Sequence, residues 1–174
     1  MRRLEDVPRG ELKDYLGKGW LTHDAMWFYH TCRDSGIQEA NRLNREAIRS
    51  LAAIEMARAR KVLCVEEGEL LTWEGLAQFM QDALAMTLPS SIYSRVSFTL
   101  VPPDVLHWEW ADGECFAYQG MKQLGVIDEY VCGVVFRIEC WLENSGIPYT
   151  VEPRIEGCIM HRTGHCAGDF TVLI

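Results

Sequence analysis

Residues 92–110 read IYSRVSFTLVPPDVLHWEW, and within them the period of the hydrophobic pattern changes from 3.6 residues to two. Apolar and polar residues alternate over 92–100 and again over 105–110, which is typical of half-buried strands. Pro102 and Pro103 separate the two runs, because a proline cannot donate a hydrogen bond within a sheet. The pattern predicts a β-hairpin over the Pro-Pro-Asp turn, at the point where the chain passes from helices to a sheet.

The residues before this hairpin are predicted to be helical. Apolar residues recur at helical spacing over 20–34 and over 37–65, and in the second segment most charged residues lie on another face. Thr72 is the predicted N-cap of a third helix, whose apolar stripe ends before Pro89.

Helices and strands are mixed after the hairpin. The pattern predicts helices over 115–124 and 131–144, and strands over 149–155, 158–161 and 166–173. The last two strands are expected to pair with each other, because Arg162, Thr163 and Gly164 supply a short turn between them.

These elements predict an α+β fold in a single domain, residues 1–174. N-terminal helices (1–90) are expected to pack on a C-terminal antiparallel sheet with additional helices, in a cysteine-rich part (91–174). A chain of this length buries about 70% of its unfolded surface on folding, so one hydrophobic core is sufficient.

Composition limits the classes of function. Lys and Arg number 17 against 25 Asp and Glu, which gives a formal net charge of -8. Nucleic-acid binding depends largely on basic residues that displace counterions, so we expect no nucleic-acid partner. No run approaches the roughly 18 apolar residues of a membrane span, and residues 1–10 contain no apolar signal segment. We therefore expect a cytoplasmic protein with no membrane partner.

The chain contains seven cysteines, an odd number that fits poorly with a fully paired disulfide framework. Five of them lie in the C-terminal part: Cys115, Cys132, Cys140, Cys158 and Cys166. In a cytosolic protein such crowding favours metal binding or thiol chemistry over disulfide bonds. Reduced cysteines that only pack in the core are an equally good explanation of the spacing.

The positions of two of these cysteines predict two of the ligands of a zinc site. Cys158 and Cys166 are equidistant from Arg162, so they would face each other across the expected hairpin. Glu156 lies two residues before Cys158, on the same face of the expected strand, and is a suitable third ligand. Zinc in proteins usually has about four ligands, drawn from Cys, His and carboxylate side chains.

A further ligand is expected from the helix predicted over 131–144. Cys132 lies in its first turn, whereas Cys140 lies eight residues farther along, about 12 Å away, and cannot share the same ion. The expected zinc ligands are Cys132, Cys158, Cys166 and Glu156, with a nearby His or Cys as the alternative to Glu156. A closed shell rich in thiolates predicts a structural ion rather than a catalytic one.

The same cysteines carry a resemblance to a known family. Cys132, a gap of 25 residues, Cys158, a gap of seven residues and Cys166 in the ending Gly-His-Cys-Ala-Gly-Asp-Phe resemble the 4-vinyl-reductase type of ligand-binding domain. In that family a helix cysteine, two hairpin cysteines and a glutamate bind zinc beside a small-molecule pocket. The resemblance therefore implies zinc and a small-molecule ligand for this chain. The family's glutamate falls where this sequence has Ile155, one position from Glu156.

A second resemblance covers more of the chain. Residues 22–28 (THDAMWF) and 113–118 (GECFAY), with the regions of Cys132 and Cys166, resemble the bacterial group related to L-2-amino-thiazoline-4-carboxylate hydrolase. Both resemblances imply a C-terminal α+β scaffold, and such domains commonly form homodimers. The second also implies an alternative function, the hydrolysis of a small cyclic amidine or amide.

Such a hydrolase needs a nucleophile or an activated water, together with a general base. Cys115 opens a predicted helix, where the helix dipole would lower the pKa of its thiol, and it is the best candidate nucleophile. His23 shares a helix face with Trp27 and His30, and it would act with Asp24 or with Cys115. The competing interpretations are packing at the edge of the core for His23, and a metal ligand or a buried residue for Cys115.

Overall fold

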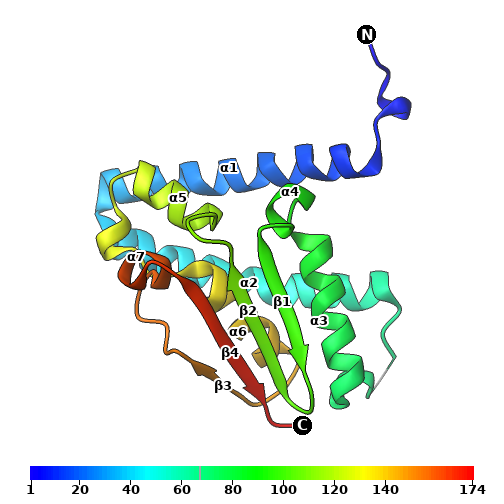
Figure 1. The fold of residues 1–174 in the computed structure, drawn as a ribbon. Coiled ribbons are helices and arrows are strands. Elements are labelled where there is room, and N and C mark those ends of the chain that lie inside the picture. The colour runs from blue at the N-terminus through cyan, green and yellow to red at the C-terminus, as the bar shows by residue number, and fades with distance from the viewer. Residues whose placement is uncertain (67) are drawn as a thin grey trace.

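The structure is a computed structural model that describes residues 1–66 and 68–174. Its helical elements are η1 (Leu4–Asp6), α1 (Arg9–Ser35), α2 (Ile37–Leu63), η2 (Glu69–Leu71), α3 (Trp73–Thr87), α4 (Ser90–Tyr93), α5 (Phe116–Gln123), η3 (Ile127–Glu129), α6 (Gly133–Asn144) and α7 (Ile159–Thr163) (Figure 1). Its strands are β1 (Val96–Val101), β2 (Val105–Trp110), β3 (Tyr149–Glu152) and β4 (Cys166–Val172). The predicted α+β fold is confirmed, with helices in the N-terminal half and the sheet, with further helices, in the C-terminal half.

Within the described residues, the strands form one antiparallel sheet in the order β1-β2-β4-β3. The predicted hairpin is confirmed, because Val96 pairs with Trp110 and Val101 pairs with Val105 across β1 and β2. Strand β4 lies in the middle of the sheet, between β2 and the short edge strand β3.

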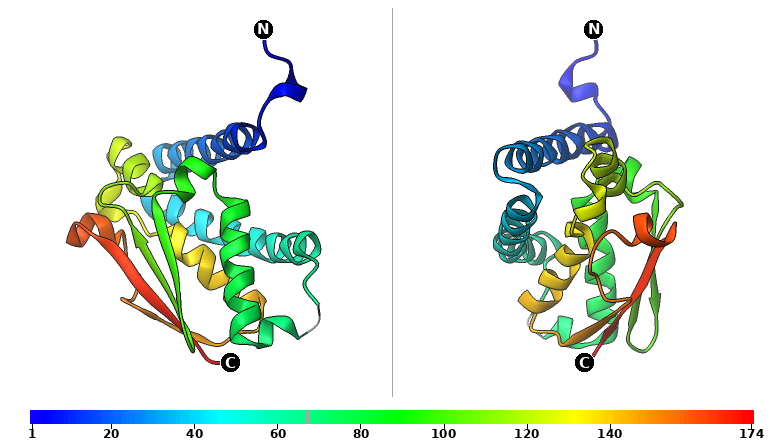
Figure 2. Two further views of the ribbon diagram at one scale, coloured as in Figure 1. Left: turned by 45° about the vertical axis from the view of Figure 1, so that its right-hand side comes forward. Right: turned by 90° about the vertical axis from the view of Figure 1, so that its left-hand side faces the viewer.

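One face of the sheet forms the core of the protein. Leu106, Trp108 and Trp110 of β2 are buried on this face together with Phe170 of β4. Helices α3 and α6 cover it, and α6 lies between the sheet and α2 (Figure 2). This alternation of buried and more exposed residues along β2 and β4 is the period of two expected for a half-buried sheet.

Helices α1 and α2 form an antiparallel pair joined at Gly36, whose φ of 85° lies in the left-handed region that glycine adopts readily. The second helix is confirmed, although it ends at Leu63 rather than at Val65, and α1 begins at Arg9 rather than at Trp20. Glycines between Arg9 and Trp20 weaken the helical pattern there. One of them, Gly17, allows α1 to approach Pro89 closely, because a Cβ at this position would lie 2.8 Å from Cγ of Pro89.

The third helix begins as predicted. The Thr72 side chain accepts a hydrogen bond from the Gly75 amide at 3.2 Å, which is the contact of an N-cap. Helices α5 and α6 also lie within the segments predicted for them.

The prediction of a hairpin between 158–161 and 166–173 is wrong. Residues 159–163 form the short helix α7, in which the Arg162 amide donates to the Cys158 carbonyl at 3.1 Å. Gly164, with a φ of 81°, ends this helix, and β4 then pairs with β2 and β3 instead. A run of four residues fits one helical turn as well as it fits alternation, so the sequence pattern could not separate the two.

The described residues contain no helix with both the length and the apolar character that a membrane span requires.

Candidate functional site

Four cysteines from separate elements gather in one region of the protein. Cys115, Cys132 and Cys158 directly precede α5, α6 and α7, and Cys166 is the first residue of β4. Their thiols lie close enough to act on one another electrostatically, as Cys115 does with Cys158 and Cys166, and Cys132 with Cys115 and Cys166. We call these four residues the cysteine cluster.

Burial dominates the chemistry of the cysteine cluster. It raises the pKa of Cys115 to about 12 and that of Cys132 to about 12, and it also raises the pKa values of Cys158 and Cys166. The predicted lowering of the Cys115 pKa by its helix is therefore wrong, because only 6% of the residue is exposed and desolvation outweighs the amides of Ala117 and Tyr118. The four thiols are protonated at neutral pH in this environment.

Hydrogen-bond donors nevertheless surround these sulfur atoms. The Met160 amide acts to lower the pKa of both Cys158 and Cys166, so both sulfur atoms face the first turn of α7. The Trp108 indole also acts to lower the Cys166 pKa, and its buried Nε1 has no hydrogen-bond partner among the described residues. Such donors would stabilise thiolates if the thiols lost their protons.

The cysteine cluster is not arranged as a finished metal site. Among residues 1–66 and 68–174, no group of three or more His, Cys, Asp or Glu side chains is placed to hold a metal ion. Glu156 is not grouped with the cysteines as a metal ligand: 62% of its side chain is exposed, and it pairs with Arg162 at 3.9 Å. Since the segment around Cys158 is not a strand, the argument that placed Glu156 beside it no longer applies. Cys115 is the fourth donor that the fold brings to the other three cysteines.

The remaining cysteine of α6 lies outside the cluster. Cys140 is fully buried, and burial raises its pKa to about 11, with Glu143, Arg49, Glu139 and Arg45 as the charged groups nearby. Its surroundings thus differ from those of Cys132, as expected for residues eight positions apart on one helix.

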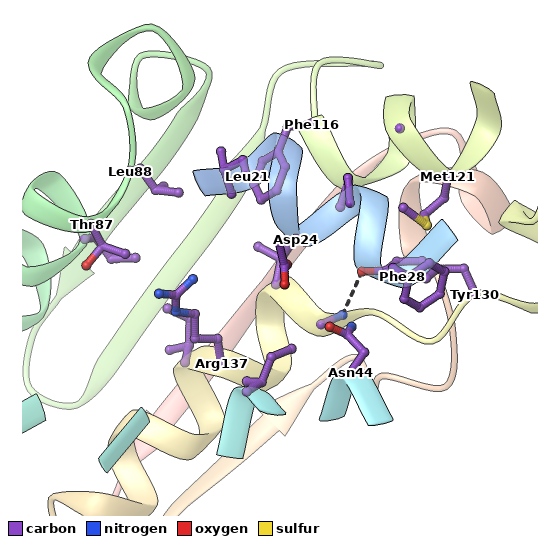
Figure 3. A pocket seen from close by; sticks show the side chains of 18 of the residues that line it. Leu21, Asp24, Phe28, Asn44, Thr87, Leu88, Phe116, Met121, Tyr130 and Arg137 are labelled. Carbon is purple, nitrogen blue, oxygen red and sulfur yellow. Dashed lines mark hydrogen bonds between the residues drawn. The ribbon is translucent and has the colours of Figure 1, made fainter. Parts of the chain in front are cut away.

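A cavity of about 140 Å³ adjoins the cysteine cluster. It lies between α1, α2, α3, α5 and α6, and its lining includes Leu21, Asp24, Phe28, Asn44, Thr87, Leu88, Phe116, Met121, Tyr130 and Arg137 (Figure 3). Most of these side chains are apolar, which is typical of small-molecule sites.

The cavity and the cysteine cluster share two helix starts. Phe116, which follows Cys115, and Gly133, which follows Cys132, both line the cavity. Tyr130 completes this wall, and its hydroxyl accepts a hydrogen bond from the Gly133 amide at 3.0 Å. Any change that draws the cysteines together would therefore also fix one wall of the cavity.

Charged groups gather on one side of the same cavity. Arg137 binds the Glu55 carboxylate through Nε, at 2.8 Å, and through Nη2, and the Trp141 indole donates to the same carboxylate at 3.2 Å. Asp24 lies in the cavity wall, and desolvation raises the pKa of its carboxyl group against the opposing effects of Arg137 and His23. The site thus combines an apolar interior with a few polar groups.

The residues that form the cysteine cluster and the cavity all lie within residues 10–171, which match the profile of a Family of unknown function (DUF6125). The chain belongs to this family. No curated protein and no solved structure matches the chain. The DUF6125 match extends from α1 to β4, and so includes all four cysteines of the cluster and both Asp24 and Arg137.

The two predicted catalytic residues, His23 and Cys115, differ in their surroundings: His23 is exposed and Cys115 is buried. His23 is exposed on α1, where its Nε2 accepts a hydrogen bond from the Trp27 indole at 3.2 Å and its ring stacks with Trp20. No hydrogen bond joins His23 to Cys115 in the described part of the chain. The neighbouring residue Asp24 faces the cavity instead.

Sequence reasoning did not identify Arg137 and Glu55 as site residues. The pair joins α6 to α2 across 82 positions of the sequence, and each residue alone looks like an ordinary charged position on an amphipathic helix. The only sequence signal is the position of each residue on the otherwise apolar side of its helix, beside Ala52 and Trp141.

Proposed function

We propose that this chain binds one Zn²⁺ ion through the cysteine cluster and a small molecule in the adjoining cavity. The observation that carries this proposal is that four cysteines, from three helix starts and one strand, lie in one region, and that the residues directly after two of them line a cavity. Zinc accepts four cysteine ligands in structural sites, as their thiolates.

The donor set fits zinc in its chemistry. Four thiols are present, and the Trp108 indole and the amides at the helix starts supply donors that would stabilise thiolates. Binding would have to draw the sulfur atoms together, because no described group already holds them at ligand positions. The ion would then be structural, since four protein ligands leave no position for a reacting water.

Zinc content tests this half of the proposal. Protein purified without added metal should contain one zinc per chain, and Cys158→Ser and Cys115→Ser should each lower that content. Cys64→Ser and Glu156→Gln are matched controls, because Cys64 is exposed and Glu156 pairs with Arg162 at the surface. Both controls should retain the ion. An unchanged zinc content in Cys158→Ser would refute the assignment.

The small-molecule half of the proposal is supported by the shape and lining of the cavity. Its volume of about 140 Å³ is close to that of an engineered cavity of about 150 Å³ that binds benzene. A second apolar cavity of about 40 Å³ shares Leu84, Leu88, Val134 and Ile138 with the first, so apolar space continues toward the sheet. A native mass spectrum of the purified chain would report bound metal, retained ligand and subunit number together.

The hydrolase alternative has less support. A thiol whose pKa is raised to about 12 by burial stays protonated and is a poor nucleophile at neutral pH. Neither Cys115 nor His23 has the hydrogen-bonded base partner that such a reaction would need within the described residues. We therefore retain ligand binding as the proposed function.

A homodimer in the cytoplasm is a further part of the proposal. Large apolar residues of α1 are exposed, among them Tyr15, Trp20 and Trp27, and exposed aromatic residues are common at protein interfaces. Light scattering of the purified chain tests this expectation, since a mass of one chain at micromolar concentration would contradict it.

A further inference from the structure

The Asp24 carboxylate is placed to receive a ligand. It lies in the wall of the cavity, on α1, with Arg137 and Asn44 on neighbouring walls (Figure 3). Asp24 is exposed to solvent, as the cavity is open, and nearby protein atoms still partly desolvate its carboxyl group. Among the described residues it has no hydrogen bond or ion pair.

The nearest cation does not neutralise Asp24. Two nitrogen atoms of the Arg137 guanidinium are committed to Glu55, which also accepts a hydrogen bond from Trp141. The Arg137 and Glu55 charges therefore largely cancel each other. His23 makes no hydrogen bond to Asp24, because its Nε2 accepts one from the Trp27 indole instead. The site is left with an excess of one negative charge.

The rest of the cavity fits the apolar body of a small ligand. Phe28 and Phe116 line it, and Tyr130 packs edge-on against Phe28 at a ring-centroid distance of 5.7 Å. Aromatic faces attract cations as well as apolar groups. The side chains of Asn44 and Thr87 also line the cavity and supply neutral polar groups.

We infer that the cavity binds a small organic cation, an apolar or aromatic amine or amidinium, whose positive nitrogen pairs with the Asp24 carboxylate. The cavity volume admits a ligand of roughly six to ten non-hydrogen atoms, judged against the cavity that holds benzene. This inference rests on the proposed ligand-binding function and specifies the charge and size of the ligand. Pairing with a cation would offset the unfavourable desolvation of the carboxylate.

A series of probes of one shape and different charge tests this inference. Benzylammonium, benzyl alcohol and benzoate would be titrated into the full chain at neutral pH and followed by heteronuclear NMR. Benzylammonium should bind at least about tenfold more tightly than benzyl alcohol, because both can donate a hydrogen bond to the carboxylate but only the ammonium adds an opposite charge. Benzoate should bind most weakly, and the resonances that shift should belong to residues lining the cavity.

Two variants assign the preference to Asp24. Asp24→Asn should abolish the preference for benzylammonium over benzyl alcohol. Asp34→Asn removes the same charge from the exposed end of α1, where Asp34 pairs with Arg33, and it should leave the preference unchanged. The inference is overturned if benzyl alcohol or benzoate binds as tightly as benzylammonium, or if Asp24→Asn keeps the preference. Failure of all three probes to bind in the cavity would instead overturn the proposed ligand-binding function together with this inference.

Discussion

Arg137 of α6 holds Glu55 of α2 through Nε and Nη2, with 21% and 18% of the two side chains exposed. The contact fixes the two helices that form the floor of the cavity. Because it largely cancels the charge of Arg137, it also leaves the Asp24 carboxylate without a neutralising cation.

Glu55→Gln should destabilise the protein by about 2 kcal/mol. The substitution leaves the half-buried guanidinium without its counter-charge and weakens the acceptor of the Trp141 indole. Urea unfolding measures the effect. Glu39→Gln is the control, because Glu39 pairs with Arg42 at the exposed surface of the same helix, where solvent screens the pair, and its effect on stability should be clearly smaller. Equal effects of the two substitutions would contradict the structural role of the Arg137 pair.

Asn41→Ala should also destabilise the protein, by about 1–3 kcal/mol. Asn41 is buried, and its amide donates to the Glu129 carbonyl at 2.8 Å while its carbonyl oxygen accepts from the Val131 amide at 3.1 Å. Both backbone groups would lose their partner in the variant. Because the segment leads directly into Cys132, zinc binding should weaken in the same variant. A stability equal to that of the wild type would show that water replaces the Asn41 side chain.

Gly168→Ala should destabilise the sheet by about 1–3 kcal/mol. A Cβ at this position would lie 2.4 Å from the Trp108 ring and 2.6 Å from the Glu152 carbonyl oxygen. Gly19→Ala is the opposite case, since a Cβ there meets no atom within 4 Å and alanine favours the helix, so that variant should be more stable by up to about 1 kcal/mol. Thermal unfolding of both variants checks the predicted decrease in stability for Gly168→Ala and the predicted increase for Gly19→Ala.

Asp24 should make stability depend on pH in a defined direction. Desolvation raises the pKa of its carboxyl group in the folded state, so the folded protein binds this proton more tightly than the unfolded chain does. The contribution of Asp24 to stability therefore falls as the pH rises from the ordinary aspartate pKa through the raised one. Asp24→Asn removes the carboxyl group and with it this loss of stability at higher pH.

The variant should be more stable than the wild type at neutral pH, and the difference should shrink in acid. Asp34→Asn should show the reverse sign at neutral pH, because the hydrogen bond and charge of Arg33 hold the pKa of Asp34 below its usual value. Melting temperatures of the three proteins between pH 3 and pH 7 test this prediction. A variant that is more stable but binds benzylammonium less well would identify Asp24 as a group retained for binding.

Much of the fold could be predicted from local patterns. The hairpin of β1 and β2 follows from strict alternation on both sides of Pro102 and Pro103, and the start of α3 follows from the cap at Thr72. These features depend only on residues close together in the sequence. The helix over 159–163 could not be distinguished in this way, because its single turn is too short for a period to be measured.

The candidate site could be predicted only in part. Cysteine crowding directed the prediction to the C-terminal half, but the choice of Glu156 depended on a strand that is absent from the described residues around Cys158. The position of Cys115 next to Cys158 and Cys166 depends on the packing of α5 against the end of the sheet, which no local pattern encodes. The pairing of Arg137 with Glu55 likewise depends on how α6 crosses α2.

X-ray absorption at the zinc edge tests the central claim most directly, because it reports the identity and distance of the atoms that bind the ion in the purified chain. We predict four sulfur neighbours at about 2.3 Å, supplied by the cysteine cluster. Protein that binds no zinc, or a first shell in which oxygen or nitrogen replaces two or more of the sulfur atoms, would contradict the account.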